Sequence, residues 1–305
     1  MVRTILLLLL GFVILPFVAW QIDTPLTSIQ WSMLGTAATG TAVAALLCFV
    51  VSQLTGNYSQ VDKLWSLMPI GYAWYFAWAV DFSERQVVMA VLVTIWGVRL
   101  TYNFWRKGGY HWLPWKGEED YRWKVLRQHP ALEGKLRWTL FNFFFISIYQ
   151  QGLILLFTLP ALKAAVVPSP ALGWLDGMAA GLMLLFILLE TVADQQQYRF
   201  QTTKYRLKAE GRKLETPYAD GFCRAGLWRW VRHPNYAAEQ AIWLSFYLFS
   251  VSATGSWLNG SLLGAVLLLL LFQGSADFSE GISAQKYPAY REYMDNVGRF
   301  LPRIS

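Results

Sequence analysis

Cysteine, histidine and charge are scarce in this chain. Its 305 residues include two cysteines and three histidines, and only 15% of the residues are charged. Cys48 lies in an apolar stretch and Cys223 in a basic one, and the sequence contains no CxxC pair or Cys/His cluster. We therefore expect neither a disulfide between the two cysteines nor a metal site.

The signatures of several soluble enzyme classes are also missing. No GxGxxG follows a predicted strand and no GxxxxGK(S/T) is present, which excludes the Rossmann and P-loop folds. The sequence also lacks GxSxG and HExxH, so neither a hydrolase elbow nor a zinc-protease helix is expected. The chain has no visible internal repeat, which argues against a transporter built from two similar halves.

Apolar and aromatic residues dominate instead. Hydrophobic residues make up 55% of the chain, with 16 Trp, 15 Tyr and 19 Phe. Long apolar runs with aromatic flanks are typical of membrane helices. The sequence thus predicts an all-α, polytopic transmembrane helical bundle. The net charge of +7 does not indicate a nucleic-acid partner, because the basic residues lie in loops between apolar runs.

Eight apolar runs are predicted to span the membrane: Ile5–Val18, Trp31–Leu54, Leu64–Val80, Gln86–Trp105, Trp138–Pro160, Ala171–Ala193, Tyr236–Ala253 and Trp257–Phe272. The first run also fits the h-region of a signal peptide, whose removal would leave seven spans. No clear small-x-small cleavage site follows it, so we prefer a short first span. The tail from Gly274 is predicted to form an amphipathic or capping helix that ends near Val297.

The distribution of basic residues predicts the orientation. The polar segments 106–137 and 194–232 hold eight and nine Lys/Arg, and the tail holds four. With eight spans, 23 of the 26 basic residues fall on the side of both termini. The positive-inside rule places that side in the cytoplasm. The membrane would be a bacterial inner membrane, or the endoplasmic reticulum in a eukaryote.

The most informative stretch is LWRWVRHPNYAAE, Leu227–Glu239. Pro234 disfavours a helical residue before it, so a helix is expected to start at Pro234 or Asn235, with Asn235 as the cap. Three arginines precede this start: Arg224, Arg229 and Arg232. Arginines beside a helix N-terminus favour an anion such as a phosphate. The alternative is a capped helix whose arginines only fix the orientation.

Ionisable residues within membrane spans are costly and are therefore candidates for function. The fourth span ends with polar residues at i, i+3, i+4 and i+7, predicted to share one interior face: Arg99, Tyr102, Asn103 and Arg106. Glu190 and Asp194 share a face at the end of the sixth span, and Glu239 lies one turn into the seventh. The alternative to a ligand site is a structural salt-bridge cluster.

Two further acids lie near the predicted membrane edges. Asp62 precedes the third span, where a helix cap is the alternative reading. Glu280 comes within two turns of the last predicted span and is expected to reach the mouth of a cavity. Tyr287 and Arg291 would then close that mouth, with a purely structural role as the alternative.

Five segments carry a resemblance to a known family: NYSQVDKLW at 57–65, WGVRLTYNFWRK at 96–107, ETVADQQ at 190–196, GLWRWVRHPNYAAE at 226–239 and KYPAYREYM at 286–294. Together they resemble the bacterial DUF1295 family, which is grouped with the membrane steroid 5-alpha-reductases and sterol reductases. The resemblance runs from about residue 55 to the end. It divides the chain into N-terminal spans at 1–54 and a catalytic bundle at 55–305.

The resemblance implies a helical bundle that holds NADPH in a cavity open to the cytoplasm. The resemblance implies that the cofactor-binding residues are Asp194, Arg232, Asn235, Tyr236 and Glu280. It also implies that Arg99 and Arg106 contact the phosphates. With the residues singled out by charge and helix geometry, the predicted cofactor site is Arg99, Asn103, Arg106, Glu190, Asp194, Arg232, His233, Asn235, Tyr236, Glu239, Glu280 and Arg291. The implied activity is reduction of a C=C bond in a steroid-like or isoprenoid-like lipophilic substrate.

The chain differs from the steroid reductases in the residues expected to polarise the substrate. Those enzymes polarise an enone carbonyl with a glutamate and a tyrosine, and the position that matches the tyrosine is Trp96 here. Tyr102 and Asp62 are the candidate catalytic replacements. The RHPNY segment and the tail are also similar to isoprenylcysteine carboxyl methyltransferases, which bind S-adenosylmethionine. That enzyme class and a non-enzymatic lipid-binding or transport bundle are the two alternatives.

Overall fold

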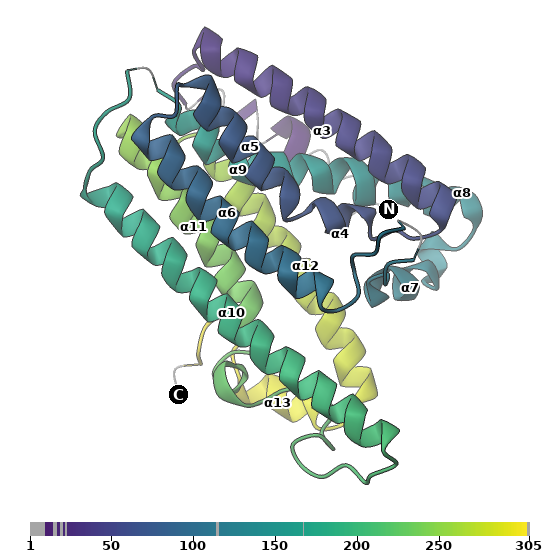
Figure 1. The fold of residues 1–305 in the computed structure, drawn as a ribbon. Helices are drawn as coiled ribbons and strands as arrows, with labels where there is room; N and C mark the ends of the chain where they lie inside the picture. The colour runs from purple at the N-terminus through teal and green to yellow at the C-terminus, as the bar shows by residue number, and fades with distance from the viewer. Residues whose placement is uncertain are drawn as a thin grey trace. The chain divides into compact units, whose positions relative to one another are not determined.

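The computed structural model describes residues 10–14, 17–18, 21, 23–113, 116–166 and 168–303 (Figure 1). These residues fold entirely into helices and connecting loops, apart from one isolated parallel bridge between Val231 and Gly298. The predicted all-α class is therefore confirmed for the described part of the chain.

The helices follow one another along the described chain as η1 (Leu10–Ile14), α3 (Ser28–Thr55), α4 (Gln60–Leu64), α5 (Leu67–Ala79), α6 (Glu84–Trp105), α7 (Tyr121–Arg127), η2 (Pro130–Leu132), α8 (Lys135–Phe141), η3 (Asn142–Tyr149), α9 (Gln150–Ala164), α10 (Trp174–Ala209), η4 (Gly226–Arg229), α11 (Pro234–Thr254), α12 (Leu262–Lys286) and α13 (Tyr290–Asn296). Of these, η1 and η3 are π-helical, and η2 and η4 are short 3₁₀ turns.

The chain divides into two compact units. The first contains Met1–Ala180 and Phe246–Leu267, and the second contains Gly181–Ser245 and Leu268–Ser305. Helices α10, α11 and α12 therefore each give one part to the first unit and the other part to the second.

In the first unit, α5 and α6 pack against each other as an antiparallel hairpin, and α9 packs against α3 and α5 (Figure 1). The turn of the hairpin passes through Asp81 and Phe82, whose φ angles are 52° and 53°. A Cβ atom at Gly97 would lie 2.6 Å from the carbonyl oxygen of Ser66. The absence of a side chain at Gly97 thus allows α6 to approach the start of α5 closely.

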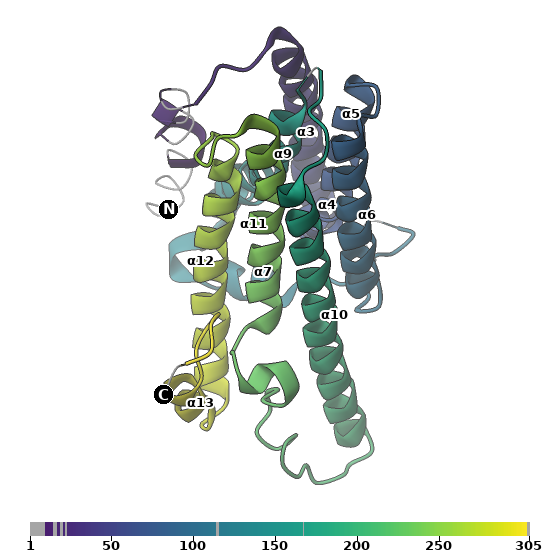
Figure 2. The same ribbon diagram turned by 90° about the vertical axis from the view of Figure 1, so that its left-hand side faces the viewer.

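In the second unit, parts of α10, α11 and α12 run side by side, and α13 follows the C-terminal end of α12 (Figure 2). The loop after α10 is held by an aromatic cluster of Phe222, Tyr290 and Tyr293. The buried Lys204 also donates a 2.8 Å hydrogen bond to the carbonyl oxygen of Gly221 in that loop. These contacts fix the polypeptide that leads into the stretch at Leu227.

Among the described residues, five helices are long and apolar enough to cross a membrane: α3, α6, the continuous helix Lys135–Ala164, α10 and α12. The predicted third span corresponds to α5, whose 13 residues are fewer than the roughly 20 that a span needs. The predicted seventh span, α11, has 21 residues, but Glu239 and Gln240 reduce its hydropathy. The first predicted span, Ile5–Val18, falls largely outside the described residues, so the count of eight stays a prediction.

Two helices extend far beyond the predicted spans. Helix α10 has 36 residues, about 54 Å of helix, against a hydrocarbon thickness of about 30 Å. Its second half therefore occupies much of what the sequence suggested was a loop. Helix α12 continues to Lys286, so Glu280 lies within it, and the predicted tail helix is the short α13.

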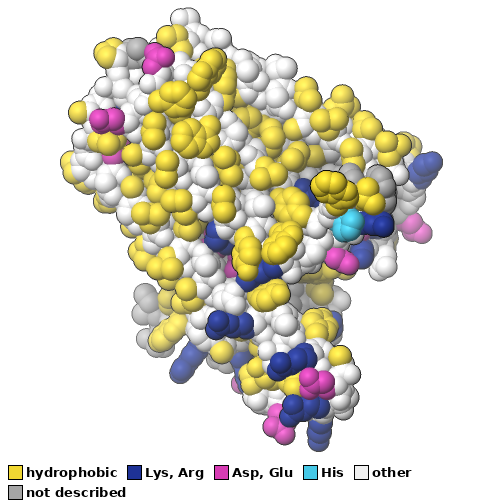
Figure 3. Space-filling view, in the orientation of Figure 1, with side chains coloured by type: hydrophobic (Ala, Val, Ile, Leu, Met, Phe, Trp, Pro, Cys, Tyr) yellow, Lys and Arg dark blue, Asp and Glu magenta, His cyan; other side chains and the backbone are white. Residues whose placement is uncertain are grey.

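The surface pattern agrees with a membrane protein. Hydrophobic side chains are spread over much of the face shown in Figure 3. Lys and Arg side chains gather around the C-terminal end of α10, where Arg206, Lys208 and Arg212 are exposed. Such a separation of apolar and basic surface is expected where a helix leaves the hydrocarbon region.

Candidate functional site

The stretch Leu227–Glu239 begins with the 3₁₀ turn η4, which is anchored on α10. Gln196 of α10 accepts the backbone N–H of Leu227 at 2.9 Å, and the indole N–H of Trp228 donates to the carbonyl oxygen of Ala193 at 3.0 Å. Gly226 has a φ of 63°, and a Cβ there would lie 2.3 Å from the Gln196 amide. Glycine is therefore required for this close approach.

The C-terminal chain then pairs with the residues that lead into α11. The backbone N–H of Arg232 donates to Gly298 O at 2.8 Å, and that of His233 donates to Arg299 O at 3.1 Å. Helix α11 starts at Pro234, as predicted, and His233 O accepts the N–H of Ala237. His233 thus occupies the cap position, and the prediction that Asn235 is the cap is wrong.

Glu280 is the centre of an ion-pair cluster in the second unit. Its carboxylate accepts Arg232 Nε at 2.7 Å and Arg299 Nη2 at 2.7 Å, and it lies 2.9 Å from His233 Nε2. Arg299 also contacts Asp277 at 2.8 Å. Arg232 further donates to two backbone carbonyls, those of Met294 and Val297. This cluster fastens α12 to the start of α11 and to the C-terminal chain.

Two of the three arginines of the predicted phosphate site already have acidic partners, so phosphate binding there stays a prediction. The Arg232 guanidinium is committed to Glu280 and to backbone oxygens. Arg224 pairs with Asp220 at 2.8 Å. Arg229 is exposed on η4, and Arg291 is exposed on α13. The sequence gives the positions of these arginines, whereas the acids that pair with them are brought close only by the fold.

Asp194 and Asn235 meet between α10 and α11. Asn235 Nδ2 donates to Asp194 Oδ1 at 3.3 Å. Glu190 lies one turn before Asp194, and Glu239 lies one turn after Asn235 and accepts the indole N–H of Trp243 at 3.0 Å. The three carboxyl groups belong to residues that are at most 6% exposed. The part of the second unit around Asn235 is therefore buried and rich in hydrogen-bond acceptors.

One atom of this cluster stands out. Asn235 Oδ1 is buried and accepts no hydrogen bond from any described residue. A buried amide oxygen without a donor is costly, so the arrangement suits a ligand that brings an N–H or O–H group. Residues near Asn235 in the sequence form an aromatic stack. The rings of His233 and Tyr236 are 5.2 Å apart and nearly parallel, and Tyr236 lies 4.8 Å from Phe272.

The other predicted site residues belong to the first unit: Asp62, Arg99, Tyr102, Asn103 and Arg106. Asn103 is buried, and its Oδ1 accepts Arg106 Nε at 3.0 Å and Nη2 at 2.6 Å. Arg99 is half-buried. The Tyr102 side chain is 56% exposed, with the Arg106 guanidinium 5.7 Å from its ring centre. The prediction that this whole helix face lines an interior is thus wrong for Tyr102.

Asp62 holds the segment after α6 against α4. Its Oδ2 accepts the indole N–H of Trp123 at 2.9 Å, while Ser59 Oγ accepts the backbone N–H of Asp120 at 2.8 Å. Burial raises the pKa of Asp62, and the charge of Asp120 raises it further. Burial alone would also raise the pKa of Asp120, but Arg122, bound to it at 2.9 Å, holds that pKa below its usual range.

We expect the variant Asp62→Asn to gain stability relative to the wild type as the pH rises from 4 to 8. A carboxyl with a raised folded pKa contributes fully below its unfolded pKa of about 4, and the contribution is lost as the pH rises through the folded pKa. The Asp120 contribution has the opposite sign, and the part that comes from Arg122 is common to both proteins, whereas its repulsion with Asp62 is lost in the variant. Melting temperatures in detergent across this range measure the difference.

The matched control is Asp295→Asn, which removes an exposed carboxyl from α13. Its melting temperature should track that of the wild type at every pH. A difference between Asp62→Asn and the wild type that does not change with pH would show that Asp62 ionises in the folded protein as it does in the unfolded one.

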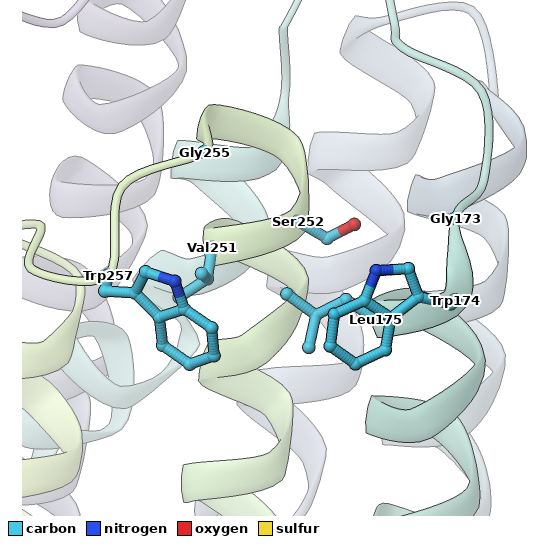
Figure 4. Close-up of a pocket in the computed structure, with 7 residues that line it drawn as sticks. All are labelled: Gly173, Trp174, Leu175, Val251, Ser252, Gly255 and Trp257. Carbon is cyan, nitrogen blue, oxygen red and sulfur yellow. The ribbon is translucent and has the colours of Figure 1, made fainter.

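The first unit also contains a cavity of about 240 Å³, between the start of α10 and the end of α11 (Figure 4). Trp174 and Trp257 stand on its two sides, with Leu175 and Val251 between them. Ser252 supplies a hydroxyl at its edge. The cavity contains none of the residues predicted from sequence, and it offers mainly apolar and aromatic contacts.

A buried ion pair lies next to this cavity. Arg85 donates to both oxygens of Asp176, at 2.7 and 3.0 Å, and also to two backbone carbonyls of the loop Pro170–Ala171. Asp176 additionally accepts the hydroxyl of Ser252 and the backbone N–H of Gly173. Because these groups satisfy one another, they stabilise the first unit and are not a ligand site.

Comparison with known proteins identifies the family. The family model of DUF1295, described as a protein of unknown function, matches residues 48–297. This chain belongs to the DUF1295 family. The DUF1295 chain is also 39% identical over 288 residues to the uncharacterized protein C594.04c of Schizosaccharomyces pombe, covering 86% of this chain and 79% of the relative. No solved structure matches it.

Sequence reasoning missed two parts of these sites. Arg299 binds Glu280 at 2.7 Å, but it lies in a tail segment without any recognisable motif. The buried pair of Arg85 and Asp176 was missed because Arg85 lies one residue before the predicted span Gln86–Trp105 and so was not among the ionisable residues within spans. Asp176 lies inside the predicted sixth span, and the rule that buried ions in membrane helices need partners would have found it.

Proposed function

We propose that this DUF1295 protein is an integral membrane enzyme that uses NADPH to reduce a C=C bond of a lipophilic, steroid-like or isoprenoid-like substrate. The five long apolar helices support a membrane protein, and the resemblance of the DUF1295 segments to the membrane steroid 5-alpha-reductases suggests the enzyme class. The proposal places the cofactor in the second unit, at the cluster of Asp194 and Asn235. In the proposed orientation, this cluster faces the cytoplasm, where NADPH is available.

The observation that carries the proposal is the buried Asn235 Oδ1, which receives no donor from the described residues. The carboxamide of a nicotinamide offers an N–H group for this oxygen, and ribose hydroxyls suit the carboxylates of Asp194 and Glu190. The stacked rings of His233 and Tyr236, which flank Asn235 in the sequence, are a candidate surface for the nicotinamide ring. The residues present therefore fit the nicotinamide half of the cofactor.

In this mechanism the chain's own residues bind the cofactor, orient it and exclude water from the site. The Glu280 cluster keeps the start of α11 in position, so that Asn235 keeps its place against Asp194. Bound NADPH supplies the hydride. A donor must also stabilise the negative charge that develops on the substrate. Asp62 and Tyr102 stay the predicted donors.

A methyltransferase that uses S-adenosylmethionine is the second candidate. Glu190, Asp194 and Glu239 bring three buried carboxyl groups into one region of the second unit. The arginines expected to attract phosphate are partly neutralised, since Arg232 pairs with Glu280 and Arg224 with Asp220. Buried carboxyl groups attract a positively charged sulfonium, whereas a cluster of unpaired arginines would repel it.

We expect Asn235→Ala to weaken NADPH binding roughly 5- to 150-fold, because a lost hydrogen bond to a ligand costs roughly 1–3 kcal/mol. Glu239→Gln should weaken binding similarly if Glu239 orients the cluster. Thermal-shift titration of the purified protein with NADPH, NADH and S-adenosylmethionine provides the measurement. NADPH should bind more tightly than NADH, with the exposed Arg229 and Arg291 available for the extra phosphate.

The matched control is Asn296→Ala, which removes an exposed amide of the same unit. It should leave the affinity unchanged. If Asn235→Ala lowers the melting temperature but binds NADPH as the wild type does, Asn235 is structural and the site is misplaced. A shift with S-adenosylmethionine alone would replace the reductase with the methyltransferase.

We further expect both termini and the segments 106–137 and 194–232 to face the cytoplasm, because they hold most of the basic residues. Two exposed positions test this orientation, Ser169 before α10 and Lys208 near its end. Single cysteines are placed at each in a chain without Cys48 and Cys223. An impermeant maleimide should label Ser169→Cys in intact cells and Lys208→Cys only after permeabilisation. Equal labelling of both in intact cells would contradict the orientation.

A further inference from the structure

The helix Lys135–Ala164 of the first unit changes its winding in the middle of a candidate membrane span. It is α-helical in α8, π-helical over the eight residues of η3, and α-helical again in α9. Long π-helical segments are rare and occur frequently at functional sites. In a regular α-helix, Asn142 and Gln151 would be about two and a half turns apart and would point in opposite directions.

The π-helical segment instead turns both amides toward the same neighbour, α3. Asn142 Nδ2 donates to Ser52 Oγ at 2.8 Å, and Gln151 Nε2 lies 3.5 Å from Cys48 Sγ. Cys48 and Ser52 are one turn apart on α3, a separation of about 6 Å along the helix. All four residues are at most 4% exposed.

Each amide has one half of its hydrogen-bonding capacity unused. Asn142 Oδ1 and Gln151 Oε1 are buried and accept no hydrogen bond from the part of the chain that the structure describes. The Ser147 hydroxyl, five residues after Asn142 and so on the same face of a π-helix, is buried and likewise lacks a described partner. We name Cys48, Ser52, Asn142, Ser147 and Gln151 the amide cluster.

Exchanging the assigned N and O atoms of an amide still leaves one of its polar atoms without a hydrogen-bond partner. The Ser52 hydroxyl donates to the carbonyl oxygen of Phe49 at 2.9 Å, so its oxygen is set to accept from Asn142. With the Asn142 amide reversed, its NH₂ group would take the position of Oδ1 and would itself need an acceptor. In either orientation, the cluster requires a polar group from outside, because an unpaired polar atom in a membrane interior is costly.

The chemistry of that group follows from the cluster. Its side chains are uncharged amides, hydroxyls and a thiol, which do not compensate an ionic ligand. A hydroxyl group can donate its one hydrogen to Asn142 Oδ1 or to Gln151 Oε1 and can also accept, so it suits either orientation of the amide that it contacts. Molecules that reach a helix interface inside the hydrocarbon region are themselves lipophilic. We propose that the amide cluster of the first unit binds the hydroxyl group of a lipophilic alcohol.

Equilibrium binding to the purified full-length protein in detergent tests this site. The probes are cholesterol and geranylgeraniol, each compared with its own methyl ether, which lacks the donor. The wild type should bind at least one alcohol about fivefold or more tighter than its ether. No nucleotide is added, so the result is independent of NADPH binding in the second unit.

Two variants test whether the amide cluster causes the preference for the alcohol over its ether, and a third variant is the control. Asn142→Leu and Gln151→Met keep the side-chain size but remove the amide, and they should abolish the preference for the alcohol. Thr158→Val removes a hydroxyl that is equally buried in the same helix but already donates to Ile154 O at 2.6 Å, and it should keep the preference. If Asn142→Leu does not fold, Ser147→Ala and Gln151→Met decide.

Two results would overturn the proposal. Equal binding of each alcohol and its ether by the wild type would mean that the amide cluster holds an ordered water only. A preference that survives in the amide variants would place the alcohol elsewhere in the protein.

Discussion

Replacement of Glu280 by glutamine should lower the melting temperature of the protein by roughly 6–20 °C, from a loss of about 3–5 kcal/mol. The Glu280 carboxylate is 1% exposed and compensates the guanidinium groups of Arg232 and Arg299. Glutamine has the same size but no charge. Its NH₂ group also cannot accept the hydrogen bond that a guanidinium now donates to the carboxylate.

The control is Glu292→Gln, the same change at an exposed position on α13. It should alter stability by less than about 0.5 kcal/mol, as surface substitutions usually do. Thermal unfolding of both variants in the same detergent provides the comparison. Equal melting temperatures for Glu280→Gln and Glu292→Gln would show that the Glu280 cluster does not hold the second unit together.

The second large effect concerns the buried pair of Arg85 and Asp176 in the first unit. We expect Asp176→Leu to destabilise the protein by about 3–5 kcal/mol, because it leaves Arg85, which is 1% exposed, without its counter-charge. The two backbone carbonyls that Arg85 also binds do not neutralise it. Thermal unfolding of the detergent-solubilised protein measures the loss.

A double variant separates the cost of an unpaired charge from the value of the pair. Arg85→Met combined with Asp176→Leu should recover most of the stability, since apolar replacement of a buried ion pair is often neutral or stabilising. The exposed pair of Arg206 and Glu210, 3.8 Å apart, provides the control, and Glu210→Gln should have little effect. A double variant as unstable as Asp176→Leu alone would mean that packing at Asp176, and not the charge of Arg85, causes the loss.

Much of the fold follows from the sequence. Pro234 was expected to begin a helix, and α11 begins there. The apolar run Trp31–Leu54 lies within α3, and Gln86–Trp105 lies within α6, because each is bounded by polar or turn-forming residues. The family was also recognisable from short motifs, since the match to DUF1295 covers residues 48–297.

The rest depends on tertiary contacts that local patterns do not contain. Helix α10 runs on to Ala209 because its polar second half packs in the second unit, where Gln196 binds Leu227 and Lys204 binds Gly221. Asn235 has the chemistry of a cap, but Asp194 competes for its side chain. The arginines before Pro234 were visible in the sequence, whereas their pairing with Glu280 and Asp220 depends on the fold.

The most direct test of the proposed function is the mass of the small molecule that copurifies with the wild type in mild detergent. The proposal predicts NADP(H) in the wild type, and its loss from Asn235→Ala under the same purification. S-adenosylmethionine in place of NADP(H), or bound lipid without any nucleotide even after incubation with NADPH, would contradict it.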